Sequence, residues 1–287
     1  MDFIQSLQKA IEYMENNILE AITYEQVAKH IHVSSYHFHR TFSLITGMTA
    51  NEYIRNRRLS MAGQELTISE TKIIDIALKY GYETPESFTK AFTRFHGVTP
   101  SVAKRAGINL KSFNRLLIKI KLEGGTIMDY RIEKREQFLI LAKSTKFRNE
   151  IISELDNTEI PDFWNACGND GTFETLKEHT SKIGSVYGVC APISKENTHF
   201  KYGIGMEFTG NDIPEGYKLW HIKPSTWAVF KCIGETPDCI GATWNKIFSE
   251  FIPGSEYNIL DDTDFEVYSD ELGADCFCEI WVPVEKK

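Results

Sequence analysis

The sequence contains no long hydrophobic run. In its 287 residues, no segment approaches the roughly 18 consecutive apolar residues that a membrane-spanning helix requires. Residues 1–18 combine acidic side chains with an amphipathic pattern, which is unlike a secretory signal. We therefore expect a cytoplasmic protein that has no membrane helix.

Cysteine is scarce and shows no metal-binding pattern. The first 166 residues contain none, and the six cysteines that follow form no C-x-x-C pair. Cys276 and Cys278 share one face of a predicted strand, but no second pair has zinc-like spacing. His37 and His39 lie two residues apart on a predicted helix, so they face apart. We expect buried, reduced thiols, with no metal and no cofactor.

Charge is divided unevenly along the chain. Residues 1–125 hold 16 Lys and Arg against 12 Asp and Glu, a net charge of +4. Residues 126–287 hold 16 against 28, a net charge of −12. An acidic protein argues weakly against nucleic acid as a partner, but this asymmetry indicates two halves with different partners.

Helical periodicity runs through residues 3–105. Thr49 and Glu52 have the spacing of a capping box, which predicts a helix start. Thr84 precedes Pro85, and this order places an N-cap before a proline suited to the first helical position. The sequence therefore predicts a helical first domain, residues 1–106.

This domain contains an internal repeat. Residues 27–53 match residues 76–104, with one extra residue in the second turn. Each unit reads as a short helix, a tight turn and a longer helix, which predicts two helix-turn-helix motifs in tandem. The aligned pairs are Ala28 with Ala77, Phe38 with Phe88, Phe42 with Phe92, Gly47 with Gly97, and Thr49 with Thr99.

The longer helix of each unit has an apolar stripe and an opposite polar face. We expect Phe38, Phe42 and Ile45, and likewise Phe88, Phe92 and Phe95, in the core. The polar faces carry donors and cations near the helix N-terminus, where a recognition helix presents side chains to base edges. The candidate base-reading residues are Tyr36, His39, Arg40, Ser43, Glu86, Thr89, Lys90 and Thr93. The candidate phosphate contacts are Ser35, Arg55, Arg58 and Lys104.

Residues 1–106 resemble the DNA-binding domain of the AraC/XylS transcriptional regulators, most closely over residues 76–105. The resemblance implies seven helices and two recognition helices that enter successive segments of the major groove. Glu86 departs from the neutral polar residue that many members carry there. Glu86 would either accept a hydrogen bond from cytosine or only affect the stability of the N-terminal end of its helix.

Residues 107–126 read as a connector. Apolar and basic residues alternate between 116 and 122, and Gly124 and Gly125 then favour a turn. We expect a β-hairpin arm over residues 113–135. The alternative is a basic amphipathic helix that touches a membrane or DNA.

Residues 127–287 mix strands and helices. Strand, helix and strands are followed by helix and strands again, which predicts an α+β domain of two similar halves. This part resembles the GyrI-like effector-binding domain, through "MDYRIEKREQFLILAKS", "TWNKIFSEFIPG", "DFEVY" and "EIWVPV". The complete order resembles the Rob-type regulators. The resemblance implies a curved antiparallel sheet whose groove binds amphipathic, often cationic aromatic molecules, as in multidrug binding.

Strand alternation selects candidate effector-binding residues. In the last strand, Cys276, Cys278, Ile280 and Val282 share a face suited to the core, whereas Phe277, Glu279 and Trp281 share the other face. A carboxylate beside aromatic rings suits a cationic ligand. Internal pairing with a Lys or Arg on a neighbouring strand is the alternative. The candidates are Glu279, Trp281, Phe277, Glu207, Tyr187 and Trp227.

The sequence therefore predicts a sequence-specific DNA-binding transcriptional regulator that senses a small effector and is not an enzyme. The expected partners are double-stranded DNA, the effector and RNA polymerase. One alternative is a hydrolase for a reactive small molecule, with Glu279 beside Trp281 as general base. Another is a domain that binds a protein partner without a ligand.

Overall fold

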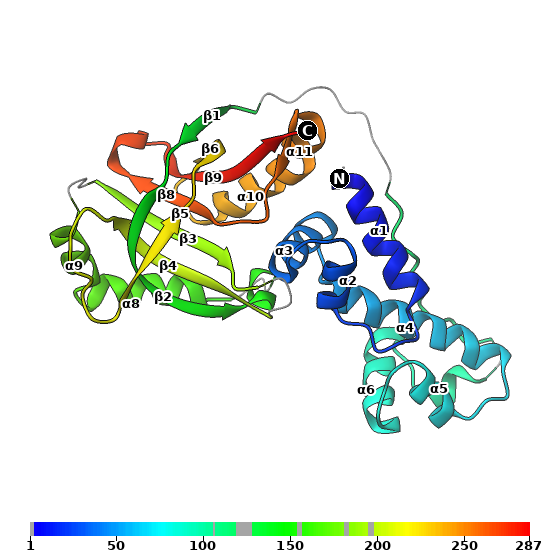
Figure 1. Ribbon diagram of the computed structural model, residues 1–287. Coiled ribbons are helices and arrows are strands. Elements are labelled where there is room, and N and C mark those ends of the chain that lie inside the picture. Colours follow the sequence, from blue (N-terminus) through cyan, green and yellow to red (C-terminus); the bar gives the residue numbers. More distant parts are fainter. Residues whose placement is uncertain (1–2, 106, 119–127, 154–156, 181–183, 195–197) are drawn as a thin grey trace.

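The helices of the first half lie to one side of a sheet formed by the second half (Figure 1). We call these parts the helix-turn-helix region, residues 3–103, and the sheet region, residues 130–286. In the described ranges, no helix is both long and apolar enough to cross a membrane. The computed structural model describes residues 3–105, 107–118, 128–153, 157–180, 184–194 and 198–287.

The two helix-turn-helix units have the same backbone conformation at the end of their longer helix. The helix α3 ends at Gly47 with φ of +70°, and α6 ends at Gly97 with φ of +81°, both left-handed. The Thr49 hydroxyl accepts a hydrogen bond from the Glu52 amide at 3.0 Å, so the predicted cap is present. The helices are α1 (Phe3–Asn16), α2 (Tyr24–His30), α3 (Ser35–Thr46), α4 (Ala50–Ile68), α5 (Ile73–Lys79), α6 (Pro85–His96) and α7 (Pro100–Ala103).

Each helix-turn-helix unit has its own apolar core. Phe38 and Phe42 lie in the first core, and Phe88 and Phe92 lie in the second. All four are at most 3% exposed, so this part of the predicted stripe is confirmed. Ile45 is a correction, because it lies near the end of α3 and is 37% exposed.

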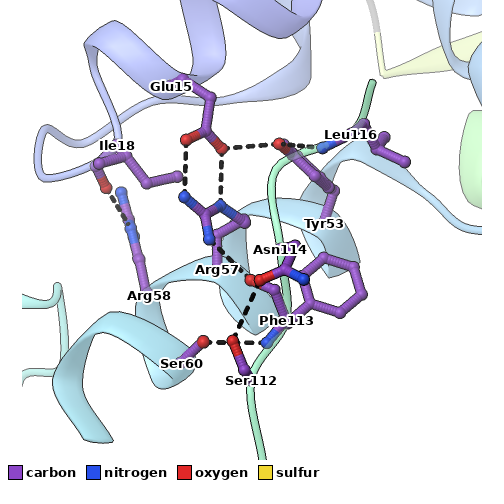
Figure 2. A network of polar contacts seen from close by, with 10 residues as sticks. All are labelled: Glu15, Ile18, Tyr53, Arg57, Arg58, Ser60, Ser112, Phe113, Asn114 and Leu116. Carbon is purple, nitrogen blue, oxygen red and sulfur yellow. Dashed lines mark hydrogen bonds and ion pairs between the residues drawn. The ribbon is translucent and has the colours of Figure 1, made fainter. Parts of the chain in front are cut away.

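A polar network fixes the segment after α7 against α1 and α4 (Figure 2). Arg57 donates hydrogen bonds to both carboxylate oxygens of Glu15, at 2.8 and 2.9 Å, and to the Phe113 carbonyl at 2.6 Å. Tyr53 donates to Glu15 at 2.6 Å and accepts from the Leu116 amide at 3.2 Å. The connector is therefore bonded to the helix-turn-helix region.

Part of the predicted hairpin over residues 113–135 lies outside the described residues. Residues 113–118 belong to no helix or strand and pair with no strand within the described ranges. Phe113 and Leu116 pack against the first helical core instead. Residues 119–127, which include the predicted turn, are not among those described.

Nine strands form one antiparallel sheet within the described residues. Its order is β1-β6-β9-β8-β3-β4-β2-β5, with β7 beside β9. The order β8-β9-β6-β1 repeats β3-β4-β2-β5, and the halves meet where β3 pairs with β8, so the predicted α+β fold of two similar halves is confirmed. The strands are β1 (Tyr130–Arg135), β2 (Phe138–Arg148), β3 (Ser185–Pro192), β4 (His199–Glu207), β5 (Tyr217–Ile222), β6 (Ser225–Ile233), β7 (Tyr257–Ile259), β8 (Asp264–Ser269) and β9 (Cys276–Lys286).

The helices of the sheet region pack on one face of this sheet. Cys278, Ile280 and Val282 lie beneath α10 with Trp244 and Phe248, which confirms the predicted core face of the last strand. The helical elements are η1 (Asn149–Ser153), α8 (Glu159–Asn169), α9 (Thr172–Glu178), α10 (Asp238–Lys246), a π-helical turn (Ile247–Phe251), α11 (Ile252–Gly254) and η3 (Asp270–Leu272).

Candidate functional sites

A cleft of about 670 Å³ lies between α8 and α10, over the central strands β3 and β8. One helix comes from each half of the sheet region, so the middle of the sheet is left uncovered. Trp164 of α8 and Trp244 of α10 line opposite sides. Tyr36, Arg40 and Leu44 of α3 also line the cleft, although they belong to the helix-turn-helix region.

Glu266 of β8 lies in this cleft. Its carboxylate accepts hydrogen bonds from the hydroxyls of Tyr268, at 3.0 Å, and Tyr202, at 3.3 Å. The indole of Trp164 donates to the Tyr202 hydroxyl at 2.9 Å, which orients it. Burial raises the pKa of Glu266 to about 7, although the two hydroxyls and the charge of Arg40 favour ionisation.

Gly188 of β3 makes room for this arrangement. It lies opposite Glu266 in the β3–β8 register. A β-carbon at this position would lie 2.6 Å from the Tyr202 hydroxyl and 2.7 Å from the Glu266 carboxylate. The hydroxyl and the carboxylate therefore occupy the space that a side chain at residue 188 would fill.

The first predicted reading helix, α3, is buried between the helix-turn-helix region and the sheet region (Figure 1). The Arg40 guanidinium lies 3.0 Å from the Asp264 carboxylate and 3.6 Å from the ring centroid of Trp244. The exposed fractions of the candidate residues are 4% for Tyr36, 1% for His39, 9% for Arg40, 7% for Ser43 and 0% for Ser35. Base reading by α3 therefore requires the helix to leave this interface.

The second predicted reading helix, α6, has an open polar face. Glu86 and Lys90 are exposed, and Thr89 and Thr93 are half-buried. The two predicted reading helices thus differ in this arrangement, because only α6 presents its polar residues to solvent.

The predicted phosphate contacts fall into two groups, one exposed to solvent and one bonded to backbone carbonyls. Arg55 is exposed, and its guanidinium lies 4.0 Å from Glu52. Arg58 donates to the Ile18 carbonyl at 2.7 Å, and Lys104 donates to the Thr71 carbonyl at 2.7 Å. Arg58 and Lys104 therefore tie helices and turns together within the helix-turn-helix region.

Glu279 is paired inside the fold. The Arg131 guanidinium of β1 donates to both of its carboxylate oxygens, at 2.5 and 2.7 Å, and the Trp281 indole donates at 3.3 Å. Glu279 is only 4% exposed. The structure therefore shows internal pairing with a neighbouring basic residue, which is one of the two alternatives from the sequence. A ligand cation would have to replace Arg131.

Four further candidates cluster with Glu279 on the sheet face away from the helices. Tyr187, Trp227 and Trp281 belong to one apolar cluster there. Tyr187 donates to Glu207 at 2.7 Å, and Arg135 also pairs with Glu207. Arginine side chains and packed rings fill this face where the sequence suggested a groove. The role of these residues in effector binding stays a prediction.

Among the six effector-binding candidates from the sequence, Phe277 lines the cleft, which corrects its expected place beside Glu279 on the opposite sheet face. The β6–β9 register shifts between Cys232 and Ile233, opposite Cys276 and Cys278, and this irregularity interrupts simple alternation at Phe277. Its ring lies 5.8 Å from that of Tyr268. Glu266 and Tyr268 are not among the effector-binding candidates, although the stretch "DFEVYSD", which includes a motif of the family resemblance, places both on one strand face.

No group of three or more His, Cys, Asp or Glu in the described ranges could hold a metal ion. All six cysteines are free thiols, and Cys167, Cys232 and Cys278 are buried. The chemical groups that line the cleft are the Glu266 carboxylate, the Arg40 guanidinium, the Cys190 thiol, two asparagine amides, tyrosine hydroxyls and aromatic rings.

A tandem helix-turn-helix joined to a sheet with a ligand-sized cleft defines a class of one-chain transcriptional regulators. Comparison with known families agrees with this class. Residues 27–106 match the helix-turn-helix domain model, and residues 131–284 match the model of Cass2, an integron-associated effector binding protein. The chain belongs to the AraC-type DNA-binding transcriptional regulators and carries a C-terminal Cass2/GyrI-like domain, as the sequence predicted.

Curated relatives match the helix-turn-helix part. The transcriptional activator AarP of Providencia stuartii is 32% identical over 112 residues, which are 39% of this chain and 81% of AarP. The regulatory protein SoxS of Salmonella typhimurium is 37% identical over 35% of this chain and 94% of SoxS. The right origin-binding protein of Escherichia coli is 30% identical, over 37% of each chain.

Solved structures resemble the two parts separately. SAV2435 bound to tetraphenylphosphonium has a TM-score of 0.48 at 18% identity, over 55% of this chain and 94% of that one. The integron cassette protein VCH_CASS2 of Vibrio cholerae has a TM-score of 0.42 at 17% identity, over 54% and 95%. The DNA-binding domain of AdpA, in complex with a target DNA, has a TM-score of 0.33 at 21% identity, over 36% and 91%.

Proposed function

We propose that this regulator senses a small lipophilic cation in the cleft between α8 and α10, with Glu266 as its counter-ion. The observation that carries the proposal is the buried carboxylate of Glu266. Its hydrogen-bond donors within the described residues are two neutral hydroxyls, of Tyr268 and Tyr202. A monovalent cation would supply the charge that this buried carboxylate lacks.

The walls of the cleft favour an aromatic ligand. Trp164 and Tyr268 lie 4.9 Å apart between ring centroids, in an edge-to-face arrangement, and Phe277 extends this surface. Aromatic faces attract cations and stack on flat rings. The volume of about 670 Å³ lies within the range of roughly 300–1,000 Å³ that is usual for small-molecule sites.

The DNA-reading roles are proposed from the tandem helix-turn-helix arrangement. We propose that α3 and α6 enter successive major-groove segments, with Tyr36, His39, Arg40 and Ser43 on α3 and Glu86, Thr89, Lys90 and Thr93 on α6. The exposed face of α6 supports its part of this proposal. Contact with RNA polymerase stays a prediction from the family resemblance.

A titration with tetraphenylphosphonium, a lipophilic aromatic cation, tests the effector site. The full chain should show quenched tryptophan fluorescence, because Trp164 and Trp244 line the cleft. We expect Glu266→Gln to weaken binding about tenfold to a hundredfold, since a buried charge pair contributes about 1–3 kcal/mol.

Glu279→Gln is the matched control. It removes the same charge from the opposite sheet face, where Arg131 already pairs with it, and should leave binding within about twofold of the original. Equal losses in both variants, or a loss only in Glu279→Gln, would contradict the proposed cleft.

Hydrolysis remains a second candidate because the pKa of Glu266, about 7, also suits a general base. The sequence assigned this role to Glu279, which is paired with Arg131. Chromatography of the bound compound after prolonged incubation separates the two functions. An unchanged compound supports a sensor, and consumption that Glu266→Gln abolishes supports an enzyme.

A further inference from the structure

Two aspartates of the sheet region bind the inner face of α3. At the helix N-terminus, the Ser34 amide and hydroxyl both donate to the Asp261 carboxylate, at 2.6 and 2.7 Å. Further along the helix, Arg40 pairs with Asp264 at 3.0 Å. Both carboxylates come from the segment that leads from β7 into β8.

Arg40 is enclosed in this contact. Its side chain is 11% exposed, and that of Asp264 is 14% exposed. The guanidinium also donates to the Tyr36 hydroxyl at 2.9 Å and stacks on Trp244. A buried guanidinium requires such partners, because removing it from water without them is costly.

The partners of α3 match what DNA offers a recognition helix. A helix N-terminus with free amides binds phosphate, and here it binds the carboxylate of Asp261. A guanidinium binds base acceptors or phosphate, and here Arg40 binds the carboxylate of Asp264. The acidic second half of the chain, with its net charge of −12 over residues 126–287, supplies these anions.

We propose that the surface formed by Asp261, Asp264 and Trp244 competes with DNA for the reading face of α3, and that an effector cation weakens this competition. The second part rests on the function proposed above. Arg40 and Glu266 line the same cleft, so a bound cation would share its aromatic walls with the guanidinium. Two cations in one low-dielectric space repel each other, and the docked state of Arg40 loses stability.

The exposed face of α6 gives this competition a defined consequence. In the docked state, α6 presents Glu86 and Lys90 to solvent, whereas α3 is covered. The docked chain therefore engages one major-groove segment, and release of α3 adds the second. The effector thereby increases both affinity and the length of the recognised site.

Asp264→Asn in the full chain tests the competition, with Asp262→Asn as the matched control. Both variants remove one negative charge from the same segment, but Asp262 pairs with the exposed Lys223 at 2.6 Å. The probe is a duplex selected by Asp264→Asn itself from a random-sequence pool. Without any effector, Asp264→Asn should bind this duplex about tenfold more tightly than the original chain, and Asp262→Asn should bind within about twofold of it.

Hydrogen exchange on the unmodified chain provides a second measurement that needs no variant. Saturating tetraphenylphosphonium should increase amide exchange in peptides that cover residues 34–46 and leave peptides from α6 unchanged. Unchanged exchange in α3, with the cleft saturated according to tryptophan quenching, overturns the coupling between effector and docking.

The outcomes separate this inference from the function on which it rests. Equal DNA affinity of Asp264→Asn and the original chain overturns the competition, even where tetraphenylphosphonium binds at Glu266. Tighter DNA binding by Asp264→Asn supports the competition, even where tetraphenylphosphonium causes no quenching and the effector proposal fails. If no variant selects any DNA, the DNA-reading role of α3 is overturned. This result would contradict both the proposed function and the competition inferred here.

Discussion

The Arg40 guanidinium and the Asp264 carboxylate form a 3.0 Å ion pair between residues 224 positions apart in the sequence. Arg40 comes from the helix that aligns with a DNA-reading helix, and Asp264 begins the strand that carries Glu266. The pair therefore joins the two functional parts of the regulator. Because Arg40 is stacked on Trp244 as well, one side chain of α3 contacts both Asp264 and a wall of the cleft.

Affinity for a lipophilic cation should rise with pH. The pKa of Glu266 is raised by burial to about 7, so the carboxyl is neutral below this value and ionised above it. A cation that binds below pH 7 must displace the proton, which costs up to about tenfold in affinity per pH unit. We expect the dissociation constant of tetraphenylphosphonium to fall severalfold between about pH 6 and about pH 8 and then to level off.

The groups around Glu266 do not produce this profile. Burial raises the pKa of Tyr202, Tyr268 and Cys190 far above neutral, and the pKa of Arg40 is raised, so it stays charged. Asp264 is the remaining carboxyl, and Asp264→Asn should keep the profile. Glu266→Gln should flatten it, and a slope that persists in this variant would assign the titration to another group.

Lys90→Ala should weaken binding to selected DNA by about 1–3 kcal/mol, because Lys90 lies on the exposed face of α6. Lys79→Ala is the control, since it removes the same charge from α5, where Lys79 pairs with Glu65 at 2.7 Å. Electrophoretic mobility shift at fixed salt measures both. Equal losses of affinity in the two variants would mean that Lys90 contributes only general electrostatic attraction to DNA.

The helix-turn-helix fold was predictable because its signals are local. The capping box of Thr49 with Glu52 acts within a few residues, and so do the glycines Gly47 and Gly97, which end the longer helix of each unit. The docking of α3 was not predictable, because Arg40 and Asp264 meet only through the relative placement of the two regions. No periodicity in either segment encodes that contact.

The cleft shows a second limit of sequence patterns. Alternation correctly separated Cys278 from Glu279, but it could not decide which sheet face is open. The face beneath the helices was expected to be core throughout, whereas α8 and α10 leave its middle uncovered at Glu266. Gly203 shows the same difficulty on the other face. A β-carbon there would meet Trp220 at 3.2 Å, so the protein's own indole fills the space above this glycine.

Glu15→Gln should destabilise the helix-turn-helix region by about 1–3 kcal/mol, because Arg57 and Tyr53 lose a charged acceptor. Glu12→Gln on the exposed side of α1 should change stability by less than about 0.5 kcal/mol. Urea denaturation at neutral pH measures both. Similar effects of the two variants would contradict a structural role for the network in Figure 2.

The stabilisation by Glu15 should also depend on pH. Burial alone would raise the pKa of Glu15, but hydrogen bonds from Arg57 and Tyr53 outweigh it and lower the pKa below 4.5. A carboxyl whose pKa is lowered on folding stabilises above its unfolded pKa and loses this contribution as pH falls through the folded value. The difference between the original chain and Glu15→Gln should therefore be constant near neutral pH and vanish in acid.

Gly188→Ala should weaken the binding of tetraphenylphosphonium about tenfold. The added β-carbon would lie 2.6 Å from the Tyr202 hydroxyl and 2.7 Å from Glu266, so both groups must move apart. Fluorescence titration measures the loss, and urea denaturation should show a cost of about 1–3 kcal/mol from overpacking.

Gly168→Ala provides the control for this substitution. Gly168 lies near the end of α8, and a β-carbon there would meet nothing within 4 Å. Alanine in a helix should leave stability unchanged or raise it by up to about 1 kcal/mol, with cation binding unaffected. Undiminished binding in Gly188→Ala would mean that cation binding does not depend on the contact between Tyr202 and Glu266, and it would contradict the proposed role of this arrangement.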